Sequence, residues 1–143
     1  MTGRTSPVDS PGEQRTHLAI SASLVGGVVE ITEDGATVRL TATPEMAADA
    51  RGLVHGGFTF GLADYAAMCA VNHPNVVLGE ANVRFLAPVV VGQEMTAHAT
   101  VTATAGKRRT VEVVVRVAGS EVLKGNLACF ILDTHILDRR APS

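Results

Sequence analysis

The chain holds one acidic side chain inside a long apolar segment, and this acid is the first candidate for chemistry. Between His55 and His73, Asp64 is the only carboxylate or basic group. Burying a carboxylate without a partner costs several kcal/mol or forces the group to take up a proton, so cores rarely hold one by accident. A carboxylate at this position therefore indicates a functional role.

Two glycines, Gly56 and Gly57, precede this acid where a helix could begin. Glycines leave the first backbone N–H groups of a helix uncovered, and the positive end of the helix dipole favours oxyanions and polarised carbonyls. Together with the lone acid, this helix start suggests acyl chemistry. The same glycines could instead allow close packing of the helix start against a strand.

The composition indicates one globular domain without a broad electrostatic partner. Of the 143 residues 46% are hydrophobic and 18% are charged, which suffices for a single core. A net charge of −2 gives no general attraction to nucleic acid or to anionic membranes. The polar N-terminus holds no signal-peptide core, and no run approaches the roughly 20 apolar residues of a membrane span. We therefore expect a cytoplasmic protein.

The domain boundaries follow from the ends of the apolar patterning. We expect residues 1–15 to be a mobile tail, residues 16–138 to form the single domain, and residues 139–143 to be a loose C-terminus. Cys69 and Cys129 lack metal-type spacing and are expected to be reduced, buried thiols. The histidines share no metal-ligand spacing either, so we expect neither a metal nor another cofactor.

Periodicity and turn residues predict one long helix and several strands. The helix is expected at residues 58–72, where nearly every face is apolar or small, and Pro74 stops it. A weak helical pattern precedes it at residues 17–25. An Asp-Gly turn joins strands at residues 28–33 and 37–43, and four more strands are expected at residues 76–86, 94–105, 109–117 and 121–132. Because an all-apolar helix must be wrapped, we predict an α+β fold with a curled antiparallel sheet of five to six strands around one central helix.

This order of elements resembles the hotdog fold, and more narrowly the phenylacetate-pathway type of hotdog acyl-CoA thioesterase. The resemblance covers about residues 25–133. The matching pieces are His55-Gly56-Gly57, Leu62-Ala63-Asp64, Asn72 at the helix end, Arg84-Phe85-x-x-Pro88, and Arg108-Arg109-Thr110 at a turn. His-Gly-Gly followed by an acid and by strands in this order is more specific than His-Gly-Gly alone.

The resemblance implies that Asp64 is the general base or nucleophile toward a thioester, and that the Gly57 N–H holds the carbonyl oxygen. These two residues lie about 10 Å apart along a helix at roughly 1.5 Å per residue, so one carbonyl cannot readily reach both. Two helices packed antiparallel about a twofold axis would bring Asp64 of one chain near Gly57 of the partner subunit. We therefore expect a homodimer with composite sites, pairing further into a dimer of dimers, or homotetramer.

Two positions depart from the family pattern. The family has Asn six residues before the His of His-Gly-Gly, and this chain has Asp49, which near the site would repel Asp64 or share a proton with it. Asp49 could instead pair with Arg51 at the surface. The residue after the helix acid is commonly Thr or Ser in the family, whereas Tyr65 stands here and would shorten or reshape the acyl pocket.

The remaining candidates surround this pair. His55 could contribute to the site or could brace the turn through its ring hydrogen bonds. The candidate substrate-binding residues lie at the helix start and along the helix, and they are Gly56, Phe58, Tyr65 and Met68. Four cations could bind the phosphates of coenzyme A: Arg84, Lys107, Arg108 and Arg109. For the last three, the alternative is that they form a solvated hairpin tip.

The function that the resemblance implies is hydrolysis of a small aromatic or medium-chain acyl-CoA to the free acid and coenzyme A, which enters only as part of the substrate. Two alternatives stay open. One is a hotdog enoyl-CoA hydratase or 3-hydroxyacyl dehydratase, in which His55 and Asp64 would share one site. The other is a non-catalytic acyl-CoA binding or sensing module, in which Asp49 has abolished hydrolysis.

Overall fold

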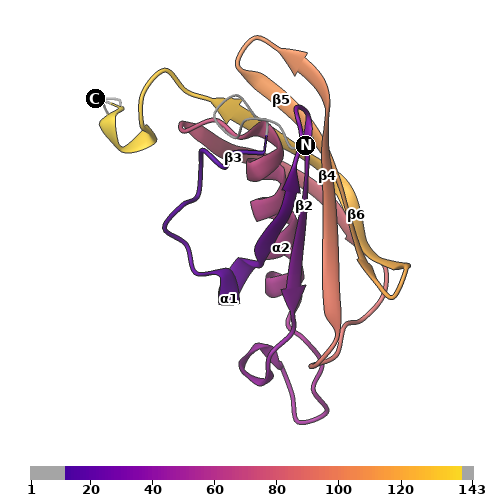
Figure 1. Cartoon of the computed structure of the whole chain (residues 1–143). Coiled ribbons are helices and arrows are strands. Elements are labelled where there is room, and N and C mark those ends of the chain that lie inside the picture. The colour runs from indigo at the N-terminus through magenta and orange to yellow at the C-terminus, as the bar shows by residue number, and fades with distance from the viewer. Residues whose placement is uncertain (1–11, 140–143) are drawn as a thin grey trace, which may run out of the picture.

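A single antiparallel sheet curls around one long helix (Figure 1). The computed structural model describes residues 12–139. Within these residues the sheet has six strands in the order β1-β2-β4-β5-β6-β3. Their bounds are β1 Gly27–Ile31, β2 Gly35–Thr41, β3 Val76–Phe85, β4 Glu94–Ala105, β5 Arg108–Val117 and β6 Ser120–Ile131. This architecture confirms the predicted α+β class.

The long helix α2 spans Gly56–Val71. Asn72 ends it in the left-handed conformation at φ 54°, and its backbone N–H donates to the Met68 carbonyl at 2.8 Å. Asn accepts this conformation more readily than most residues, and Pro74 follows two residues later. The helix expected at residues 17–25 is only the single turn α1, Ala22–Val25. Short 3₁₀ turns occur at Pro44–Met46 and Ile136–Asp138.

An irregular segment precedes α1 and arches past one side of α2, and we name residues 12–21 the N-terminal strap (Figure 1). The Asn72 side chain holds it at two points, donating to the Glu13 carbonyl at 2.7 Å and accepting from the Arg15 N–H at 2.7 Å. The Gln14 amide donates to the Tyr65 hydroxyl at 2.9 Å. Residues 13–15, expected to belong to a mobile tail, thus contact the helix, and residues 1–11 and 140–143 lie outside the described part.

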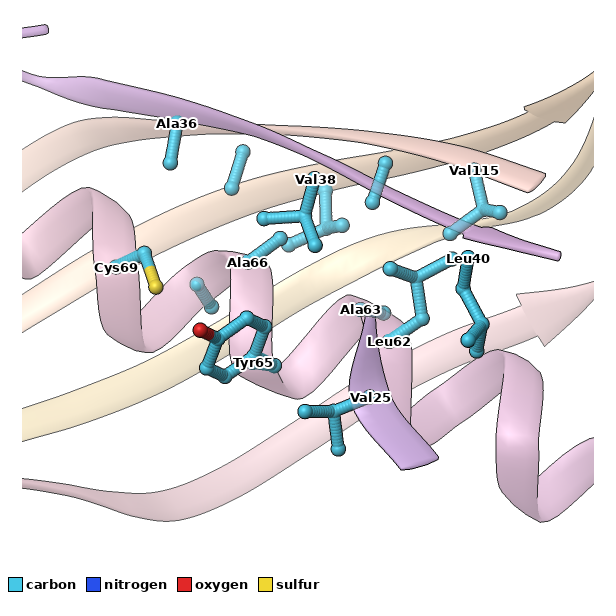
Figure 2. Close-up of a cluster of buried hydrophobic side chains, with 14 of the residues drawn as sticks. Val25, Ala36, Val38, Leu40, Leu62, Ala63, Tyr65, Ala66, Cys69 and Val115 are labelled. Atoms are coloured by element: carbon cyan, nitrogen blue, oxygen red, sulfur yellow. The ribbon is translucent and has the colours of Figure 1, made fainter. Parts of the chain in front are cut away.

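The core lies between α2 and the concave face of the sheet. Alternate residues of the central strands are buried there, including Val38 and Leu40 of β2. They pack against a helix surface of small side chains such as Ala63 and Ala66, which lets the helix approach the sheet closely (Figure 2). Both cysteines are free and buried, as predicted.

Strand β3 lies at one edge of the sheet, and within residues 12–139 it pairs only with β6. Gly125 of β6 makes this pairing possible, because a Cβ there would run into the backbone of β3 at Asn82 and Val83. The other backbone edge of β3 has no strand beside it among the residues that the structure describes. Among the described residues, no helix has the length and hydropathy needed to cross a lipid bilayer.

Candidate functional site

His55 shapes the start of α2. Its backbone is extended, with φ −62° and ψ 131°, and its ring Nδ1 accepts a hydrogen bond from the Gly57 N–H at 2.9 Å. Its own N–H donates to the Met46 carbonyl at 2.9 Å, which ties the preceding loop to the helix. A side chain that accepts from the second helical residue satisfies one of the free N–H groups at a helix start. His55 thus braces the turn, the second of the two roles considered for it.

The amide groups of the two glycines consequently differ. The Gly57 N–H, which the family resemblance assigns to the thioester carbonyl, already has the His55 ring as its acceptor. The Gly56 N–H has no hydrogen-bond partner among residues 12–139. In a single chain, the amide free to polarise a carbonyl is therefore that of Gly56. A histidine two residues before Gly57 makes this contact possible, but the rotamer of its ring decides which amide it occupies, and the sequence does not give the rotamer.

A cavity of about 380 Å³ opens at this end of the helix. Its walls are mostly apolar and come from Val54, Gly56, Thr59 and the segment at residues 85–89. The Phe85 ring packs against Gly56, and its nearest atom would lie 3.3 Å from a Cβ added there. The cavity could therefore hold an apolar group whose carbonyl faces the free amide of Gly56.

Asp64 lies about two turns further along α2 and does not line this cavity. Its Oδ1 atom is buried and has no hydrogen-bond partner within the described residues. Loss of solvent raises the pKa of Asp64 from 3.8 to about 6. The pKa of Cys129 in β6 is raised to about 12, mainly by burial and secondly by the nearby Asp64 carboxylate. This interaction places Asp64 close to β6. Asp64 can therefore act as a base near neutral pH.

Asp49 occupies an exposed turn before the helix. Its Oδ1 accepts from the backbone N–H groups of Arg51 at 3.0 Å and Leu53 at 3.2 Å. In the described structure the Arg51 guanidinium forms no ion pair with it. The carboxylate therefore shapes the loop through backbone contacts, and it shares no hydrogen bond with Asp64.

The predicted substrate-binding side chains beyond Gly56 lie away from the cavity. Tyr65 is buried beneath the N-terminal strap, where Gln14 donates to its hydroxyl and the ring centroid of His17 lies 6.1 Å from its own. Met68 is fully buried in the core. Phe58 is half-buried, packs against the core and meets the His55 ring edge-on at 6.4 Å between centroids. Within one chain, none of these three side chains lines the cavity at the helix start.

The predicted phosphate-binding cations divide into two groups. Those at the β4–β5 hairpin have partners within the chain. Lys107 pairs with Asp133 at 2.8 Å, Arg108 lies 5.6 Å from the Phe130 ring centroid, and Arg109 donates to the Gly106 carbonyl at 2.7 Å. Arg84, at the end of β3, is exposed and has no such partner among residues 12–139. In the same range, no group of three or more His, Cys, Asp or Glu side chains could hold a metal ion.

Residues 51–124 match the family model described as the thioesterase superfamily. This stretch contains the helix start, Asp64 and the strands from β3 to β5.

Solved structures of similar proteins show the same fold. The protein PH1136 from Pyrococcus horikoshii, described as uncharacterized, is 52% identical with a TM-score of 0.88, covering 90% of this chain and 98% of that chain. The PaaI protein from the phenylacetic acid degradation operon of E. coli is 23% identical with a TM-score of 0.72, covering 78% and 83%. A hypothetical thioesterase from Streptococcus pneumoniae TIGR4, crystallised with coenzyme A, is 15% identical with a TM-score of 0.69, covering 76% and 87%. These likenesses confirm the predicted hotdog fold.

Two relatives differ from one another in what they do. A methylthioribose-1-phosphate isomerase from Aquifex aeolicus is 48% identical over 120 residues, which are 83% of this chain and 26% of that protein. The chain thus spans about a quarter of the length of this relative. The transcription factor FapR from Caldanaerobacter subterraneus is 24% identical over 140 residues, which are 96% of this chain and 70% of that protein.

Proposed function

This chain belongs to the thioesterase superfamily, and from that premise we propose that it hydrolyses a small aromatic or medium-chain acyl-CoA to the free acid and coenzyme A. The observation that carries the proposal is the state of Asp64. A buried carboxylate oxygen without a partner, with its pKa raised to about 6, is costly for the fold and suited to proton transfer near neutral pH.

In the proposed reaction, the Gly56 N–H at the positive end of α2 donates to the thioester carbonyl oxygen. This hydrogen bond strengthens as the oxygen gains negative charge in the transition state. Ionised Asp64 takes a proton from water, and the resulting hydroxide adds to the carbonyl carbon. The tetrahedral intermediate then expels the thiolate of coenzyme A, which takes the proton from Asp64. In the alternative route Asp64 attacks the carbonyl directly, and water hydrolyses the mixed anhydride that forms.

We propose that the two groups meet across a homodimer. Along one helix, Gly56 and Asp64 lie about 12 Å apart at roughly 1.5 Å per residue, which is too far for one carbonyl. A twofold arrangement with antiparallel helices would supply Asp64 from one chain and Gly56 from the other. The unpaired edge of β3 supports a dimer, because a second copy of this strand could cover it. Further pairing of dimers into tetramers stays a prediction.

A second candidate is an acyl-CoA binding module without turnover. Its support is the likeness to the transcription factor FapR over 96% of this chain, together with the Gly57 amide already bonded to the His55 ring. Under this reading acyl-CoA binds without release of thiol.

A thiol-release assay across a panel of acyl-CoA substrates tests the proposed function. We expect wild-type protein to release coenzyme A and Asp64→Asn to lose roughly 10²-fold or more in rate. Glu33→Gln, at an exposed position in a hairpin turn, is the matched control and should leave the rate unchanged. Tight binding of acyl-CoA with no thiol release would support the binding module instead.

A complementation experiment tests the composite site. Gly56→Pro removes the proposed donor, and proline is well tolerated at the first helical position. If each site uses both chains, random mixing of Gly56→Pro and Asp64→Asn subunits restores about a quarter of wild-type activity, because half of the dimers then carry one intact site. If each site lies within one chain, mixing restores nothing. Sedimentation analysis should show a dimer or a larger even-numbered assembly.

A further inference from the structure

Two cations stand directly opposite each other where β3 ends. The strand register pairs Arg84 of β3 with Lys124 of β6, and both side chains are exposed. Their neighbours Val83 and Leu123 face the core, and successive residues of a strand point to opposite faces, so Arg84 and Lys124 lie on the outer face. Like charges directly opposite in an antiparallel pair are destabilising. This pairing therefore favours an anion at the same place.

No acid within the described residues neutralises the pair. The ion pairs there are Arg39–Glu94, Lys107–Asp133 and Arg116–Glu121. Neither Arg84 nor Lys124 makes a side-chain hydrogen bond within residues 12–139. The two charges are thus available to a ligand.

The next cross-strand pair adds neutral donors on the same face. Asn82 stands opposite Asn126, two residues along each strand from the cations, and both are exposed. Their side-chain amides have no hydrogen-bond partner in the described part of the chain. Two acids lie near the patch: Glu112 of β5 is level with Asn126 and diagonal to Lys124, and Glu80 lies further along β3. Neither forms an ion pair with Arg84 or Lys124 in the described part. We name Arg84, Lys124, Asn82 and Asn126 the outer-face patch.

We propose that the outer-face patch binds the phosphate groups of coenzyme A. This inference rests on the proposed function, because it takes coenzyme A as the ligand. Guanidinium and ammonium groups beside amide donors suit phosphate oxygens, which accept several charge-assisted hydrogen bonds. The next residue after Arg84 is Phe85, which lines the cavity on the inner face. A flexible pantetheine arm passing around the end of β3 would join a thioester in that cavity to phosphates on the outer face.

The cations of the β4–β5 hairpin are weaker candidates for the same role. Lys107 already has a carboxylate partner, and Arg108 and Arg109 are engaged by an aromatic ring and by a backbone carbonyl. A phosphate would have to compete with these contacts, whereas at Arg84 and Lys124 it would relieve a repulsion.

Calorimetric titration of the full chain tests the inference without requiring turnover. The probes are coenzyme A, adenosine 3′,5′-bisphosphate as the phosphates without the arm, and pantetheine as the arm without phosphates. For the double variant Arg84→Gln with Lys124→Gln, we expect a loss on the order of 10- to 100-fold in affinity for coenzyme A and for the bisphosphate. Its affinity for pantetheine should not change. The matched control removes two other positive charges that have carboxylate partners, as Arg39→Gln with Arg116→Gln, and should bind all three as wild type.

Equal affinity of wild type and the double variant for coenzyme A would overturn the inference, as would a wild-type protein that does not bind coenzyme A. Should the double variant fold poorly, Lys124→Glu serves in its place, because it puts an opposite charge beside Arg84 and still removes the phosphate site. Patch-dependent binding without thiol release would keep this inference and refute hydrolysis. Hydrolysis with the same KM for acyl-CoA in wild type and the double variant would support the proposed function and refute the phosphate-binding role of the patch.

Discussion

Replacing Asp64 by Asn should lower activity and raise stability at the same time. The folded-state pKa of about 6 lies above the ordinary 3.8 because the carboxylate is desolvated and its Oδ1 has no partner. A folded protein that holds this proton more tightly than the unfolded chain loses stability as the pH rises from about 4 to 6. Below that range both states are protonated, and the carboxylate carries no penalty.

The magnitude follows from the two pKa values. They differ by about two units, and one unit corresponds to about 1.4 kcal/mol, so the full penalty above pH 6 is about 3 kcal/mol. Asn has nearly the same shape and never ionises. Asp64→Asn should therefore be more stable than wild type by up to about 3 kcal/mol at pH 8, which raises Tm by roughly 5–10 °C. Near pH 4 the two proteins should melt alike.

Thermal and urea unfolding of both proteins at pH 4 and pH 8 gives the comparison, with Glu33→Gln as the exposed control. A variant that is no more stable than wild type at pH 8 would refute the desolvation reasoning, since it would show that the ionised carboxylate has a partner in the assembled protein. A gain of equal size at both pH values would also refute it, because the effect would then not arise from ionisation.

Four further outcomes are expected. The kcat/KM of wild type should rise about tenfold per pH unit up to about pH 6 and then level off, as a stopped assay across pH 4–8 would show, whereas a flat profile would exclude Asp64 as the base. His55→Ala removes the cap on Gly57 and should lower the free energy of unfolding by about 1 kcal/mol in urea titrations. Asn72→Ala removes both hydrogen bonds to the N-terminal strap, so trypsin should cleave after Arg15 faster than in wild type, and an unchanged rate would contradict the strap contacts. Gly125→Ala forces a Cβ into β3 and should cost about 2 kcal/mol or more, with faster hydrogen exchange in β3 than in β4.

The sequence predicts the fold well because its elements have strong local signals. Pro74 and the Asp-Gly turn at Asp34 mark an end and a reversal, and alternation along residues 94–105 predicts β4 with its observed bounds. The lead-in helix ends at Val25 as its pattern predicts, but it begins only at Ala22. The residues before it belong to the strap, which Tyr65 and Asn72 hold in a non-helical path. Such long-range contacts leave no periodic signal.

The candidate site is only partly readable from the sequence. Asp64 stands out because a lone acid among apolar residues is a compositional signal that needs no geometry. Which glycine amide is free depends on the rotamer of the His55 ring, and spacing cannot supply that. The sequence likewise does not show that Arg84 faces Lys124, since the pairing joins residues 40 apart and depends on the register of β3 with β6.

The contact between Gln14 and Tyr65 also lets the intrinsic fluorescence of this protein report on the N-terminal strap. The chain has one tyrosine and no tryptophan, so its near-ultraviolet emission comes chiefly from one phenol. That phenol lies where the N-terminal strap meets the central helix. Fluorescence of the unlabelled protein therefore reports whether the strap is bound to α2 at Tyr65. A change in emission before the sheet unfolds would show when the strap detaches.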